Sequence, residues 1–170
     1  IDTPTMQAFL DAAHPTDEES LRCALRQLRQ RVMAALVVRD MSGQAPLSEV
    51  VETMSTLADL TTNVALDALH RQLAATFGEP LDKHGQPQRL LVIGMGKLGG
   101  RELNVSSDVD YIFIYPEDGE TAGSAETRRK IEVYEFFTRL GKKLIATLAE
   151  TPGDGQFFAS TCACARTAIP

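Results

Sequence analysis

The sequence predicts an α+β protein in which an N-terminal helical segment is followed by a small mixed sheet with helices. Apolar residues recur at spacings of three and four through the first half of the 170-residue chain, a pattern typical of amphipathic helices. After residue 89, short apolar runs are bounded by glycine and polar turns, which is typical of buried strands. The helical pattern therefore comes first and the strand pattern second.

Two long helices are predicted before residue 80. Thr16 and Glu19 have the spacing of a capping box, and the helix they begin is expected to end near Asp40. A second helix is predicted from about Leu47 until Gly78 and the following proline end it. The first apolar stripe consists of Leu21, Leu25, Leu28, Val32 and Leu36. The second consists of Leu57, Leu60, Val64, Leu69, Leu73 and Phe77. Both stripes are interpreted as packing faces.

The strands and turns of the second half form the predicted core. Residues 79–88 are rich in proline, glycine and charge and are interpreted as the linker into it. Residues 90–93 predict a buried strand, residues 94–100 a glycine turn, and residues 108–115 a central strand.

After the central strand, a turn-rich loop leads into one more helix. That helix is expected to begin at Ser124 or Ala125 and to continue through Leu148, and a short strand over residues 156–158 would then join the sheet. The predicted organisation is a helical subdomain over residues 1–80, a core over 81–158 and an aberrant tail over 159–170.

Two aspartates on the central strand are the leading candidates for chemistry. Because strand side chains alternate between faces, Asp108 and Asp110 share one face, whereas Val109 and Tyr111 point to the other. Two carboxylates on one face favour a divalent cation, above all Mg²⁺, which also binds water and substrate phosphates. An Asp-x-Asp pair by itself is more often a solvated strand end, but the preceding glycine turn favours the metal site.

The glycine turn also fits a competing pattern. Gly94, Gly96 and Gly99 follow a strand with the spacing of a dinucleotide-binding fingerprint. The next strand begins too soon afterwards for a parallel crossover, which needs roughly a dozen residues or more. Dinucleotide binding is therefore the disfavoured alternative.

The run LLVIGMGKLGGRELNVSSDVDYIFIYPEDGET, residues 90–121, resembles the nucleotidyltransferase core of the glutamine synthetase adenylyltransferase family, whose members are bifunctional adenylyltransferase/adenylyl-removing enzymes. The Glu-Leu-Asn before Ser-Ser-Asp and the Tyr-Pro-Glu after the strand resemble the N-terminal, deadenylylating half. Residues 134–145 resemble the helix that follows in that half. The resemblance implies a polymerase-β-like fold.

The resemblance also implies an activity. The N-terminal half removes AMP from a tyrosine of adenylylated glutamine synthetase by Mg²⁺-dependent phosphorolysis, which gives ADP. Two metal ions are implied, with Asp108 and Asp110 as catalytic residues and metal ligands. The implied partners are glutamine synthetase, a PII-type signalling protein, ATP or ADP, and phosphate, and the implied location is cytoplasmic.

Phosphate is expected to bind near the glycine turn. Gly99 and Gly100 would present backbone N–H groups to it, and Ser106 or Ser107 would donate a hydroxyl. Lys97 and Arg101 are candidate charge partners, although a solvated surface position is favoured for each.

The tail departs from the family. Members carry a third carboxylate in a stretch close to Phe-Arg-Val-Asp-Met-Arg-Leu-Arg-Pro, which this chain lacks. Synonymous codons exist for residues 158–170 that, read one base earlier, encode that stretch, and Thr161 then stands where the third aspartate would be. We hypothesise a frameshift near Gln156 or Phe157. The sheet is then incomplete at its C-terminal end, and the chain alone has little or no catalytic activity.

The overall charge restricts the partners. A net charge of −6 disfavours nucleic acid, because binding to phosphate backbones requires a basic face. No membrane segment is predicted. A non-catalytic module that senses nucleotides or binds proteins through its helices remains the alternative to an enzyme.

Overall fold

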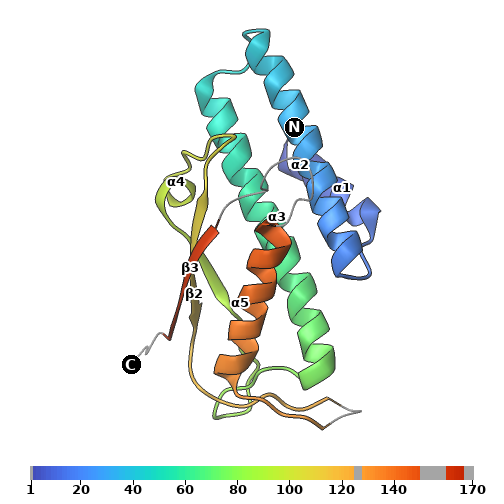
Figure 1. Cartoon of the computed structure of the whole chain (residues 1–170), viewed down its shortest axis with the longest axis vertical. Coiled ribbons are helices and arrows are strands. Elements are labelled where there is room, and N and C mark those ends of the chain that lie inside the picture. Colours follow the sequence, from blue (N-terminus) through green and yellow to red (C-terminus); the bar gives the residue numbers. More distant parts are fainter. Residues whose placement is uncertain (1, 125–127, 150–159, 167–170) are drawn as a thin grey trace.

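The computed structural model describes residues 2–124, 128–149 and 160–166, the last range by its backbone. The elements in chain order are α1 (Thr3–Ala13), α2 (Glu18–Met41), α3 (Leu47–Phe77), β1 (Leu91–Gly94), α4 (Gly96–Gly99), β2 (Val109–Tyr115), α5 (Val133–Ala149) and β3 (Ser160–Arg166). Figure 1 shows the helices packed together with the sheet along one side. The predicted α+β class is confirmed.

The two predicted long helices are present, and a shorter one precedes them. α1 was not predicted, although Asp2 caps it by accepting a hydrogen bond from the N–H of Thr5 at 3.1 Å. The capping box of α2 lies one residue later than expected: Asp17 accepts from the N–H of Ser20, and the Ser20 hydroxyl closes the box. Thr16 and Glu19 do not form it, because Asp17 takes the N-cap conformation.

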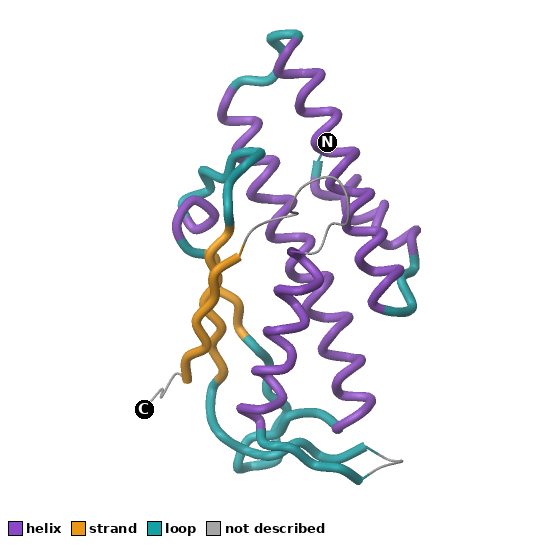
Figure 2. The backbone as a smooth tube through the Cα atoms, viewed as in Figure 1, coloured by secondary structure: helices purple, strands orange, loops and turns teal. Residues whose placement is uncertain are grey.

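The sheet has three strands in the order β1-β2-β3. β1 runs antiparallel to β2 and pairs Leu91 with Ile114. β3 runs parallel to β2 and pairs Thr161 with Asp110. Figure 2 shows the strands in orange next to the helices, and β2 is the middle strand of the sheet. The tail predicted to be aberrant thus supplies a strand, and the short strand predicted for residues 156–158 lies outside the described residues.

The antiparallel pairing of β1 and β2 rules out the dinucleotide fingerprint. That motif needs a parallel strand after the helix that follows the glycines. Here the strand after α4 returns in the opposite direction, so Gly94, Gly96 and Gly99 do not belong to a parallel βαβ unit.

The last helix begins later than predicted. The prediction was a helix from Ser124 or Ala125, but the residues before Val133 pair with residues 119–121 instead. The N–H of Thr121 donates to the carbonyl of Ile131 at 2.9 Å, and the N–H of Val133 donates to the carbonyl of Gly119 at 2.9 Å. These bonds hold the backbone before Val133 in an extended pairing, so α5 begins only there.

One hydrophobic core joins the helices to the sheet. The inward residues of β2 are buried, and Tyr111, Phe113 and Tyr115 contact α3 or α5. The stripes predicted for α2 and α3 face this core, with Leu60 and Val64 half-buried. The predicted domain boundary near residue 80 remains a prediction. None of the helices among the described residues is long and apolar enough to span a membrane.

Candidate functional site

Asp110 lies on the face of the sheet that the helices leave open, and Asp108 lies directly before β2, which begins at Val109; we call these two residues the acidic pair. β2 alternates as predicted: Val109 and Tyr111 are buried, whereas Asp108 and Asp110 are exposed. On the same face, Ile112 pairs with the exposed Ile93 of β1. Within the described part of the chain, neither carboxylate of the acidic pair is engaged in a hydrogen bond or ion pair. Both are therefore available to a ligand.

The glycine turn brings the backbone close to the acidic pair. Gly96 has a φ of +55°, and a Cβ there would lie 3.6 Å from Oδ2 of Asp110. The N–H of the adjacent Met95 donates to the carbonyl of Asp110 at 2.8 Å. The start of α4 therefore lies beside Asp110.

Gly99 and Gly100 have structural roles that the sequence did not indicate. A Cβ at Gly99 would lie 2.7 Å from the carbonyl oxygen of Gly94, so this close approach requires glycine. The N–H of Gly99 donates to Met95 at 3.2 Å and that of Gly100 to Gly96 at 3.0 Å. In this conformation both N–H groups already have acceptors inside the turn, so phosphate binding through them stays a prediction.

Ser106 and Ser107 lie in a turn organised by Asn104. Oδ1 of Asn104 accepts from the N–H of Ser106 at 3.1 Å and from the Ser107 hydroxyl at 2.7 Å. The buried Ser107 also accepts from the Lys97 ammonium at 3.3 Å, whereas Ser106 is exposed. Of the two predicted hydroxyls, Ser106 is therefore the more accessible, and Lys97 reaches the turn that precedes Asp108.

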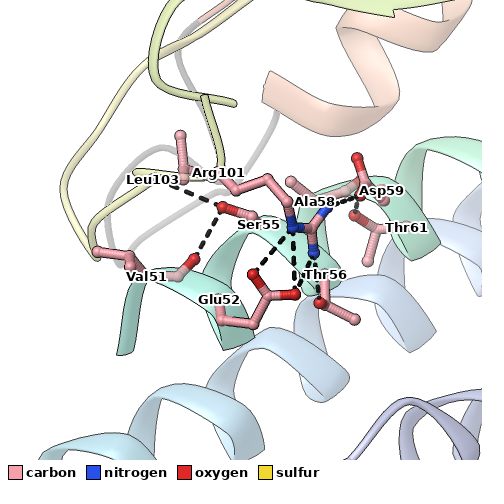
Figure 3. Close-up of polar contacts among 9 residues, drawn as sticks. All are labelled: Val51, Glu52, Ser55, Thr56, Ala58, Asp59, Thr61, Arg101 and Leu103. Carbon is pink, nitrogen blue, oxygen red and sulfur yellow. Dashed lines mark hydrogen bonds and ion pairs between the residues drawn. The ribbon is translucent and has the colours of Figure 1, made fainter. Parts of the chain in front are cut away.

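Arg101 is exposed, as predicted, but its side chain also takes part in an ion-pair network with α3 (Figure 3). Its Nη2 lies 2.7 Å from Oε1 of Glu52 and 2.9 Å from Oγ1 of Thr56, and its Nη1 lies 2.9 Å from Oδ2 of Asp59. We call these four residues the Arg101 cluster. The hydrogen bonds from Arg101 hold the pKa of Glu52 below its usual value. The network was missed from sequence, although Glu52 and Asp59 share one face of the predicted helix.

Tyr111 fastens the strand of the acidic pair to α3 from the buried side. Its hydroxyl and that of Thr62 share a hydrogen bond of 2.7 Å. Burial raises the pKa of Tyr111 to about 12, with a smaller contribution from the charge of Asp59 and an opposing one from the hydrogen bond to Thr62. The phenol therefore stays protonated and neutral below that pH.

The donor set of the acidic pair fits Mg²⁺. Mg²⁺ favours hard oxygen ligands and is commonly held by one or two carboxylates together with water and phosphate. Over residues 2–124 and 128–149, no three His, Cys, Asp or Glu side chains gather into a metal site. The ladder position beside Asp110 on β3 is occupied by Thr161, which is where the frameshift hypothesis puts the missing aspartate.

The chain is similar in sequence to a family of known proteins. Residues 3–160 match the family described as Glutamate-ammonia ligase adenylyltransferase. Similar proteins, each called a bifunctional glutamine synthetase adenylyltransferase/adenylyl-removing enzyme, come from three bacteria. Identity is 49% for Aromatoleum aromaticum, 48% for Burkholderia mallei and 52% for Nitrosomonas eutropha, over 93%, 91% and 90% of this chain. The chain spans only 16–18% of the length of these relatives.

Proposed function

This chain belongs to the glutamate–ammonia ligase adenylyltransferase family, and from that premise we propose that it is part of the half that removes AMP from glutamine synthetase. The observation that carries the proposal is the acidic pair, two exposed and unengaged carboxylates at the start of β2, of which Asp110 lies beside α4. The Glu102-Leu103-Asn104 run before the acidic pair and the Tyr115-Pro116-Glu117 run after it support this half.

In the proposed reaction, an oxygen of phosphate attacks the phosphorus of the adenylyl group, the bond to the tyrosine oxygen breaks, and ADP leaves while the tyrosine regains a proton. Asp108 and Asp110 would hold Mg²⁺, which when bound would supply positive charge to stabilise the oxygens of this displacement. The exposed hydroxyl of Ser106 and the ammonium of Lys97 are the groups of this chain best placed near the turn to meet phosphate.

We further propose that this chain alone has little or no catalytic activity. Thr161 occupies the ladder position beside Asp110, and a hydroxyl does not supply the charge of a carboxylate. The family match ends at residue 160, which supports the frameshift hypothesis for the tail. On this proposal the chain retains metal and nucleotide binding without turnover, and a PII-type protein remains a proposed partner of the longer protein.

Metal binding is the first test. Mn²⁺ is titrated into the 170-residue chain with ADP present, and free Mn²⁺ is followed by electron paramagnetic resonance. We expect binding that Asp108→Asn and Asp110→Asn abolish. Asp67→Asn is the matched control, because Asp67 is an exposed aspartate on α3, and it should leave the affinity unchanged. Binding that is insensitive to both acidic-pair substitutions would overturn the proposed site.

Turnover is the second test. The chain is mixed with adenylylated glutamine synthetase, phosphate and Mg²⁺, and ADP is measured. We expect no release above background. Robust ADP formation would contradict the proposed loss of catalysis while leaving the proposed site intact. Sequencing the coding DNA tests the frameshift separately, because codons that do not encode the family stretch in the shifted frame would refute it.

A further inference from the structure

Arg101 has a backbone conformation that its residue type disfavours. Its φ is +55°, and it follows α4 at the position where a Schellman motif requires a left-handed residue. The N–H of Arg101 donates to the carbonyl of Leu98 at 3.0 Å, and the N–H of Glu102 donates to that of Lys97 at 2.7 Å, which are the two bonds of that motif. Glycine is the usual residue there. An arginine in this conformation is strained, and favourable side-chain contacts offset that strain.

The contacts of the Arg101 guanidinium supply that compensation. Glu52, Thr56 and Asp59 lie about one turn apart along a single face of α3. The guanidinium presents donors in a fixed planar fork and contacts all three residues at once. The small ammonium of a lysine lacks this span. The three contacts therefore depend on the planar shape of the guanidinium as well as on its charge.

A short loop with internal hydrogen bonds connects the Arg101 cluster to the acidic pair. Leu103 is fully buried, and its N–H donates to the hydroxyl of Ser55 on α3 at 3.4 Å. Asn104 then organises the turn through Ser107 by accepting from it and donating to it. Asp108 is the next residue after Ser107. The loop that leads to Asp108 is therefore attached to α3 at its beginning, through Arg101 and Leu103.

We propose that Arg101 is a positioning residue, which fixes Asp108 for metal binding by fastening the loop over residues 101–108 to Glu52 and Asp59. This inference rests on the proposed function, because it takes the acidic pair as the metal site. The side chains of Arg101, Glu52 and Asp59 are 44%, 59% and 48% exposed. Solvent screening therefore limits what the cluster adds to global stability, and positioning is separable from unfolding.

The test compares two substitutions of Arg101 with a matched control. Arg101→Lys keeps the charge but not the fork, and Arg101→Gly favours the positive φ while removing the contacts. Arg39→Lys is the control, because Arg39 forms a similar bidentate pair with Glu49, at 2.7 and 2.9 Å, near the α2–α3 turn. We expect both Arg101 variants to weaken Mn²⁺ binding by up to about 10-fold, the lower end of the roughly 10- to 100-fold effect of losing a residue that contacts a metal ligand directly, because Arg101 acts on Asp108 through the loop. Arg39→Lys should leave the affinity unchanged.

A second readout does not depend on metal. Amide hydrogen exchange at Ser106 and Ser107 should accelerate in Arg101→Lys, while exchange at Tyr111 in β2 stays as in the wild type. Acceleration throughout α3 and β2 would mean that Arg101 only stabilises the fold, and would overturn the inference.

The metal titration separates the two proposals. If Asp108→Asn abolishes binding but both Arg101 variants bind Mn²⁺ as the wild type does, the positioning role is overturned and the proposed site stands. If the wild type shows no binding that depends on Asp108, the proposed function fails and the positioning role fails with it.

Discussion

The buried hydroxyl of Tyr111 should make the stability of the chain depend on alkaline pH. Burial raises the pKa of Tyr111 to about 12, whereas an unfolded chain titrates its tyrosines near 10. Between these values the folded chain keeps a proton that the unfolded chain releases, so the free energy of unfolding falls as the pH rises. The difference between the two pKa values lowers the free energy of unfolding by about 3 kcal/mol once the pH exceeds both. About half of this loss of stability has occurred by about pH 11.

Comparison with Tyr111→Phe isolates this effect from other groups that titrate at high pH. Urea unfolding of the wild type and the variant is followed by circular dichroism at about pH 8 and about pH 11. We expect the stability advantage of the wild type to shrink by 1–2 kcal/mol, roughly, between these conditions. Tyr134→Phe, which removes a hydroxyl from an exposed ring, controls for the substitution. An advantage that stays constant with pH would refute the argument.

Three further substitutions test other parts of the structure. Gly141→Ala should destabilise the chain by about 1–3 kcal/mol in urea unfolding, because its Cβ would lie 2.8 Å from the ring of the buried Phe113; a gain in stability, as at an open helical glycine, would contradict this. Asp17→Ala should cost about 1 kcal/mol in thermal unfolding, since it removes the acceptor that begins α2, and an unchanged midpoint would contradict it. Thr161→Asp should tighten Mn²⁺ binding, because it puts a third carboxylate in the ladder beside Asp110; wild-type affinity would contradict it.

Local patterns predicted the positions of the long helices and of the two antiparallel strands well, but the burial predicted for residues 90–93 was wrong, because Leu91 and Ile93 of β1 are exposed. The apolar stripes that begin at Leu21 and Leu57 follow the helical period over many turns, so chance interruptions matter little. The alternation from Val109 to Tyr115 likewise predicted which face of β2 is buried. The predicted start of α5 was wrong, because backbone pairing between Thr121 and Ile131 overrides the local preference for helix.

The candidate site was predictable only in part. The acidic pair could be found because its two residues lie close together in sequence and on one face of a strand. The Arg101 cluster could not, since Arg101 lies 49 residues after Glu52 and no local period connects them. The role of the glycines could not be decided from the sequence, because close packing against Gly94 and close approach to a phosphate both require a missing side chain.

The long separation between Arg101 and its acceptors has a consequence for the order of folding. Closing a loop of this length has an entropic cost that local helix formation does not have. Synthesis proceeds from the N-terminus, so Glu52, Thr56 and Asp59 leave the ribosome on α3 before Arg101 does. If α3 has begun to form by then, it presents the acceptors in their final spacing, and the loop that carries Asp108 would acquire its shape by docking onto that helix.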